Sequence, residues 1–184
     1  SISDAFNHIR LLGVLFGKEN EAEELINKER HQLSVIAAKV GAVVVEKRKR
    51  VMRIMGRDQV STPGDNSFQN EYIRKAGGIP PVFGENGTVI PVSLEQWRQF
   101  NPQVIYGCGD DRKLLKKLEG PGWRDVEAIK NKQVFFFPCN LTCRAATYPG
   151  FFVSWLSATL YGSEFSDPRK FVNKERVVKQ KRVD

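Results

Sequence analysis

The stretch that most constrains the fold lies between Val92 and Pro138, where helix-like and strand-like segments alternate. Residues 93–100 predict a helix, with a serine as N-cap and three large apolar side chains on one face. Residues 104–106 and 133–137 are short apolar runs that predict buried strands. The amphipathic residues 110–118 lie between them. Two strands joined through a helix form a right-handed unit with parallel strands, so the sequence predicts an α/β fold.

Particular motifs in this stretch resemble a known family. The segments VSLEQ, NPQVIYG and GPGWRDVEAIKNKQVFFFP occur in this order. Their order and spacing resemble the second lobe of periplasmic substrate-binding proteins of ABC importers, in the branch that takes up ferric siderophores, haem and cobalamin. HIRLLGVLFGKENEAEELIN resembles the start of the family's interlobe helix, and TPGDNSFQNEYIRKAGG resembles a further segment of the second lobe. The resemblance covers roughly Ile2 to Phe165 and includes no first lobe, so we expect a truncated protein.

The rest of the chain predicts a helical segment followed by alternating strands and helices. We expect helices at 1–17, 18 to about 45, 67–76 and 151–161, strands at 51–55 and 88–90, a long loop at 139–150 and a last helix from 167. In the first helix, Phe6, Ile9, Leu12 and either Leu15 or Phe16 are expected to face inward. The predicted fold class is α/β: a three-layer Rossmann-like lobe with a mostly parallel sheet, preceded by a long helical segment. We assign residues 1–46 to an interlobe helical segment and residues 47–184 to the C-terminal lobe.

The charge of the chain bears on its partners. Its formal net charge is +8, with much of the excess in the runs 47–50 and 174–182. Neither run is interleaved with aromatic residues, so we expect a basic surface or an attraction for anionic ligands, and no nucleic-acid partner. No run of eighteen apolar residues occurs. The resemblance implies a protein in the periplasm or anchored on the outer face of the cytoplasmic membrane.

Candidate ligand-binding residues lie in the loops that follow the predicted strands, because ligands of open α/β sheets bind at the carboxyl ends of the strands. The family binds its ligand between the lobes against such loops, which implies a metal-chelate ligand here. Arg144 is the strongest candidate, since a guanidinium pairs well with the oxygens of an anionic ligand, although it could instead brace the loop. The candidates are Arg57, Asp58, Asn66, Phe68, Cys108, Asp110, Arg144 and Tyr148.

All three cysteines lie in these loops. Cys108 and Cys139 each follow a predicted strand, and neighbouring strand ends lie about 5 Å apart, so a disulfide between them is the first expectation. Free thiols are the second expectation. A metal site formed by Cys108, Cys139 and Cys143 is the third, because the spacing matches no zinc motif and no histidine is near in sequence. A bridge between Cys139 and Cys143 is also open.

No catalytic motif is apparent, so we expect a binding protein that has no enzymatic activity and no cofactor. The resemblance implies that Glu95, in the VSLEQ helix, docks onto an ABC permease in the cytoplasmic membrane. The stabilising effect of a carboxylate near a helix N-terminus is an alternative reason for this residue. Two rival functions stay open: a metal-cluster or chelatase-like α/β protein that uses the loop cysteines, and a basic nucleic-acid-binding domain. Without a first lobe, an uncovered apolar helix face could also lead to self-association.

Overall fold

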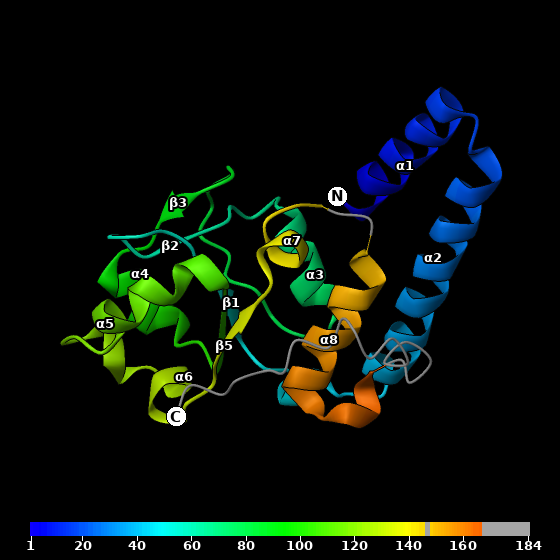
Figure 1. Cartoon of the computed structure of the whole chain (residues 1–184). Helices are drawn as coiled ribbons and strands as arrows, with labels where there is room; N and C mark the ends of the chain where they lie inside the picture. The colour runs from blue at the N-terminus through cyan, green and yellow to red at the C-terminus, as the bar shows by residue number, and fades with distance from the viewer. Residues whose placement is uncertain (146–147, 167–184) are drawn as a thin grey trace.

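A computed structural model describes residues 1–145 and 148–166 of the chain (Figure 1). The helices are α1 (Ile2–Phe16), α2 (Glu19–Gly41), α3 (Phe68–Lys75), α4 (Leu94–Phe100), α5 (Leu115–Leu118), α6 (Glu127–Lys130), α7 (Cys139–Thr142) and α8 (Pro149–Tyr161). The strands are β1 (Val51–Arg53), β2 (Ser61–Thr62), β3 (Ile90–Pro91), β4 (Val104–Cys108) and β5 (Val134–Phe137). Short 3-10 turns occupy Val45–Lys47, Gly109–Leu114, Trp123–Asp125 and Ser163–Phe165. The predicted last helix and the basic run 174–182 lie outside the described residues.

The central sheet has the strand order β1-β4-β5, and both strand pairs are parallel. Val51 is paired with Val104, and Ile105 is paired with Val134. The chain returns from β4 to β5 through α5 and α6, as a crossover between parallel strands requires. The three strands therefore point the same way, and their carboxyl ends meet at one edge of the sheet.

Helices cover both faces of this sheet (Figure 1). Side chains alternate between the faces along each strand, so Val51 joins one core while Met52 joins the other. One core lies between the sheet and α2, α3 and α8. The second core contains Trp97 of α4 and the leucines that follow β4. This arrangement confirms the predicted three-layer α/β fold with a parallel sheet and a preceding helical segment.

The helical segment is a hairpin of α1 and α2 that extends away from the sheet (Figure 1). Ser1 caps α1 through a capping box with Asp4, and Gly17 ends it in the left-handed conformation at φ 62°. Phe6 and Ile9 are buried as predicted. The expectation for the end of α1 was wrong, because Leu12, Leu15 and Phe16 are 51%, 70% and 69% exposed. α1 and α2 are close at Gly13, where an added Cβ would lie 2.7 Å from the Cβ of Ala22.

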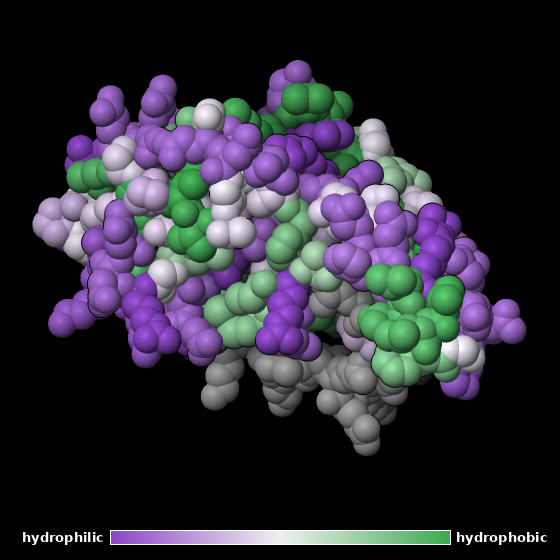
Figure 2. All heavy atoms as spheres, turned by 90° about the horizontal axis from the view of Figure 1, so that it is seen from above, coloured by the Kyte–Doolittle hydropathy of each residue, from purple (hydrophilic) through white to green (hydrophobic). Residues whose placement is uncertain are grey.

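The exposed end of this hairpin forms an apolar patch, which consists of Leu11, Leu12, Val14, Leu15 and Phe16. Figure 2 shows hydrophobic residues gathered over this end of the molecule. Contiguous apolar surface of this kind is characteristic of contact sites between chains or between parts of one protein.

A buried polar contact joins the long helix α2 to the lobe. Glu29 is 1% exposed, and its Oε2 accepts hydrogen bonds from the backbone N–H groups of Gly150 (2.8 Å) and Phe151 (3.4 Å). These groups belong to the first turn of α8, whose N-cap Tyr148 makes no side-chain capping bond. Glu29 therefore serves as the acceptor that the helix N-terminus requires, and its negative charge complements the helix dipole.

Four local expectations need correction. The predicted helix at 110–118 is a 3-10 turn followed by the short α5. The expected loop 139–150 begins with α7, because its first residues close a helical turn in which the N–H of Cys143 donates to the carbonyl of Cys139. The second helix ends at Gly41 rather than near residue 45. The loop 56–66 contains β2, which pairs antiparallel with β3, itself placed at Ile90–Pro91.

Candidate functional site

The candidate site lies at the edge where the carboxyl ends of the parallel strands meet. β4 ends at Cys108, and β5 ends at Phe137, to which Cys108 is paired in register. Cys139 begins α7 directly after Pro138, and Cys143 is the residue at the end of that helix. Because these positions are four residues apart on one helical turn, their side chains lie on the same side. The topology thus brings a thiol from β4 and two thiols from α7 to one place.

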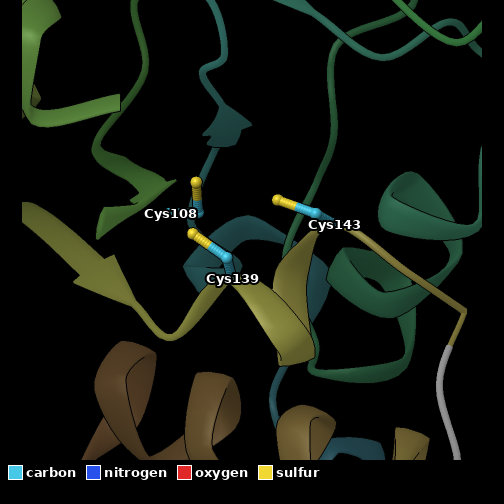
Figure 3. A group of neighbouring side chains, drawn as sticks. All are labelled: Cys108, Cys139 and Cys143. Carbon is cyan, nitrogen blue, oxygen red and sulfur yellow. The ribbon is translucent and has the colours of Figure 1, made fainter. Parts of the chain in front are cut away.

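The three sulfur atoms form a compact thiol cluster, made of Cys108, Cys139 and Cys143 (Figure 3). All three Sγ atoms lie within 4.8 Å of one another. Cys108 is buried, Cys139 is half-buried and Cys143 is exposed, so the cluster extends from the core to the surface. The predicted proximity of Cys108 and Cys139 is confirmed, but the structure has all three cysteines as free thiols. The disulfide between them is therefore absent here and stays a prediction.

A buried ion pair of Arg53 and Asp111 supports the cluster. Nη1 of Arg53, at the end of β1, donates to Oδ2 of Asp111 at 2.7 Å, and the side chains are 1% and 9% exposed. The same oxygen accepts from the backbone N–H of Cys108 at 2.8 Å, and Oδ1 accepts from that of Gly56 at 3.2 Å. Nη2 of Arg53 also donates a hydrogen bond to Sγ of Cys143, at 3.6 Å. The ion pair thus fixes the backbone of one cysteine and contacts the sulfur of another.

Burial governs the protonation of the inner groups. It raises the pKa of the Cys108 thiol well above its ordinary value, and a hydrogen bond with Cys139 adds to the effect. Burial also raises the pKa of Tyr106, which lies under the guanidinium of Arg53. Both groups are therefore neutral near pH 7. Among the described residues, the buried Tyr106 hydroxyl and Nε of Arg53 have no hydrogen-bond partner. Two polar groups close to the cluster could therefore still form hydrogen bonds.

The structure places the remaining sequence-predicted residues as follows. Arg57, Asp58, Asn66, Asp110 and Arg144 are exposed, and Tyr148 is 37% exposed. Asp110 adjoins the cluster, because its Oδ2 accepts a hydrogen bond from Sγ of Cys139 at 3.8 Å. Phe68 is half-buried and stacks edge-on against Tyr72, with ring centroids 5.3 Å apart, so packing accounts for it. Glu95 is exposed in the first turn of α4.

Sequence reasoning missed Arg53 and Asp111. A signal was present at Arg53, since a charged residue within the apolar run 51–54 must find a partner if the strand is buried. Asp111 follows Asp110 in a segment interpreted as an amphipathic helix, where two adjacent carboxylates look equally exposed. In the 3-10 turn Asp111 points inward instead, with the residue only 6% exposed.

The fold defines a class: an α/β lobe with a parallel sheet, and in such sheets ligands bind at the carboxyl ends of the strands. The sequence profile described as "Periplasmic binding protein" matches residues 3–141. The chain belongs to this family.

Two relatives and one solved structure illustrate the similarity. The molybdate-binding protein MolA of Haemophilus influenzae is 26% identical over 165 residues, which cover 86% of this chain and 46% of MolA. The Fe(3+)-citrate-binding protein YfmC of Bacillus subtilis is 23% identical and is matched over 64% of this chain and 37% of its own length. The periplasmic heme-binding protein RhuT from Roseiflexus sp. RS-1 superposes with a TM-score of 0.78 at 17% identity, covering 89% of this chain and 64% of RhuT.

The chain spans about half the length of MolA, and the likeness to RhuT concerns the fold. Within residues 1–145 and 148–166, no helix combines the length and the apolar character that crossing a membrane requires.

Proposed function

We propose that this chain is the C-terminal part of the substrate-binding component of an ABC importer, in which residues 1–46 link the lobes and residues 47–184 form the second lobe. The whole protein binds a metal chelate such as a ferric siderophore, haem or cobalamin outside the cytoplasmic membrane, free in the periplasm or anchored to the membrane. The observation that carries the proposal is a parallel sheet with exposed loops at the carboxyl ends of its strands, in a member of this family. The named ligands of MolA, YfmC and RhuT are molybdate, ferric citrate and heme, and each contains a metal.

Two exposed arginines in these loops support an anionic ligand. Arg57 and Arg144 are exposed in loops that follow β1 and α7, so their guanidinium groups are available to solvent. A guanidinium offers paired donors that match carboxylate, catecholate or oxyanion oxygens. In a two-lobed protein, the opposite lobe would complete the cleft around a ligand held by these groups. Binding to the present chain alone should therefore be weak.

Calorimetry on the full-length protein tests the ligand class. Titrations with haem, a ferric siderophore, cobalamin and molybdate should show submicromolar binding of one of the three chelates. Arg144→Ala should weaken that binding about 10- to 100-fold, the loss expected for a hydrogen bond to a charged group. The control is Arg124→Ala, because Arg124 is also exposed but lies in the turn Trp123–Asp125 before β5, outside the loops that follow the strands. Tight binding of molybdate alone would replace the chelate by an oxyanion, and equal losses in both variants would contradict the role of Arg144.

Glu95 is the proposed docking residue for the permease. It is exposed near the N-terminus of α4, and Trp97 on the opposite side of that helix is buried against Trp123. The packing of Trp97 fixes the helix, so the carboxylate has a defined position on the surface. An exposed charge of this kind steers and orients docking more than it supplies affinity.

An uptake assay tests the docking assignment. In the full-length protein, Glu95→Ala should reduce transport while leaving the calorimetric affinity for the ligand unchanged. Glu119→Ala, at the exposed end of α5, serves as the control and should transport normally. A loss of ligand affinity with normal permease association would show that Glu95 acts elsewhere.

The thiol cluster favours one alternative, a metal-cluster or chelatase-like α/β protein that uses these cysteines. Three sulfur atoms within 4.8 Å of one another are compatible with a bound cluster. Metal and acid-labile sulfide analysis of anaerobically purified protein separates the two functions. Stoichiometric iron with sulfide would favour the alternative, whereas protein free of sulfide would support the binding protein.

A further inference from the structure

The structure assigns a second ligand class to this chain: we propose that Cys108, Cys139 and Cys143 together bind one thiophilic d10 metal ion, such as Zn²⁺ or Cd²⁺. The site belongs to the chain itself and does not depend on a role in transport. Thiolates are soft ligands that select such ions over hard cations. The group of possible ligands consists of the three cysteines alone, so the thiols carry the site.

The spacing of the sulfur atoms carries the first step of the argument. A four-coordinate ion with metal–sulfur bonds of about 2.3 Å holds its sulfur ligands about 3.8 Å apart. The three Sγ atoms lie within 4.8 Å of one another, so no pair exceeds that separation by more than about 1 Å. Figure 3 shows the Cys143 side chain directed toward the other two thiols. Side-chain rotations alone can close the site, without a change in the sheet.

To close around an ion, the outer thiols must move toward the inner one, and their surroundings allow this. Cys108 is 4% exposed, and Asp111 holds its backbone N–H, so this thiol is the fixed ligand. Cys139 and Cys143 lie at the two ends of α7, half-buried and exposed. The outer two thiols have room to adjust toward the inner one.

The surrounding charges supply the outer shell that metal ligands usually have. Nη2 of Arg53 donates a hydrogen bond to Sγ of Cys143, as an outer-shell group does to a metal ligand. Asp111 fixes Arg53 in turn, so the donor has one position. Asp110 is exposed, and its Oδ2 accepts a hydrogen bond from Sγ of Cys139, so a carboxylate adjoins the cluster on its exposed side.

Metal titration of the reduced chain tests the proposal. Under argon with a phosphine reductant, Cd²⁺ should bind with a stoichiometry of one per chain and produce sulfur-to-cadmium charge-transfer absorption, and Zn²⁺ should displace or compete with it. Cys139→Ser and Cys143→Ser should each weaken binding about 100-fold or more, at least the upper loss seen when only an outer-shell partner is removed. Both positions are outside the core, so these variants stay informative if Cys108→Ser fails to fold.

The chain offers a matched control, because it contains two histidines, His8 and His31, both on the helical hairpin. The double variant His8→Gln/His31→Gln should bind Cd²⁺ with unchanged affinity. Loss of binding in this variant, or wild-type affinity in either single serine variant, would overturn the site. A stoichiometry of one ion per two chains would also overturn it, since the three thiols of one chain would then not suffice.

Oxidation of the thiols provides a second, independent test of the metal site. Diamide takes two electrons and two protons from a pair of thiols to form a disulfide, and the bridge expected between Cys108 and Cys139 would remove two of the three ligands. The oxidised chain should then lose Cd²⁺ binding and regain it on reduction. Binding that persists after complete formation of this disulfide would refute a three-thiolate site.

Discussion

Removal of the Asp111 carboxylate should destabilise the chain more than almost any other polar substitution. In Asp111→Ala the guanidinium of Arg53, at 1% exposure, keeps its charge but loses its ion-pair partner. The N–H groups of Cys108 and Gly56 lose their acceptor at the same time. Truncation of one partner of a buried ion pair costs about 3–5 kcal/mol, because an uncompensated charge is left in the core.

The measurement is chemical and thermal unfolding of the reduced chain, followed by circular dichroism. For a protein of 184 residues, a loss of this size lowers the Tm by roughly 6–20 °C. The matched control is Asp125→Ala, because Asp125 pairs with Arg98 at 3.6 Å with both side chains about half exposed. A surface pair of this kind contributes about 0–1 kcal/mol.

A double substitution separates the charge from the packing. Arg53→Met/Asp111→Leu removes both charges and fills a similar volume, so it should be clearly more stable than Asp111→Ala. If Asp111→Ala costs no more than Asp125→Ala, or if the double variant is as unstable as the single one, a buried ion pair is not what holds this edge of the sheet together.

Three further predictions concern separate parts of the chain. Leu15→Ser/Phe16→Ser should reduce concentration-dependent self-association in analytical ultracentrifugation, whereas Val82→Ser, equally exposed on a loop, should not; an unchanged association would exclude the apolar patch as its cause. Gly150→Ala should lower the free energy of unfolding by about 1–3 kcal/mol, because a Cβ there would lie 2.8 Å from the Cβ of Gln32. The control is Gly109→Ala, whose Cβ meets open space; equal stability of the two variants would contradict close packing of α8 on α2. Alkylation near pH 8, followed by peptide mass spectrometry, should modify Cys143 first and Cys108 last, because burial keeps the Cys108 thiol protonated; equal rates would show that Cys108 is accessible.

The sequence was informative wherever a local pattern had one structural solution. The runs around Val104 and Val134 could be recognised as parallel strands because they are apolar, short and joined by a crossover of suitable length. Ser93 could be recognised as an N-cap, and the structure shows its capping box with Gln96. The exposure of Leu15 and Phe16 was not predictable, because periodicity identifies an apolar face without identifying what covers it.

The site was predictable to the level of topology. That Cys108 and Cys139 lie close together followed from the parallel strands that precede them. The position of Cys143 relative to them depends on α7, a single turn too short for a periodic signal. The partner of Arg53 was beyond sequence reasoning, since Asp111 is 58 residues away and only the folded 3-10 turn directs it inward.

The contact of Glu29 with the first turn of α8 fixes one point of α2 on the lobe. The number of residues between this point and α1 therefore determines the direction in which α1 points. Each residue advances a helix by about 100° and 1.5 Å. One residue inserted between Ala22, which meets α1, and Glu29, which meets α8, would swing α1 by about 100° around the axis of α2. An insertion of four residues would leave α1 rotated by only about 40° from its present direction, and would shift it outward by about 6 Å along α2. The direction of α1 is thus set in whole residues by the length of α2, and such an insertion would also break the hydrogen bond from the N–H of Ile2 to Glu71 of α3.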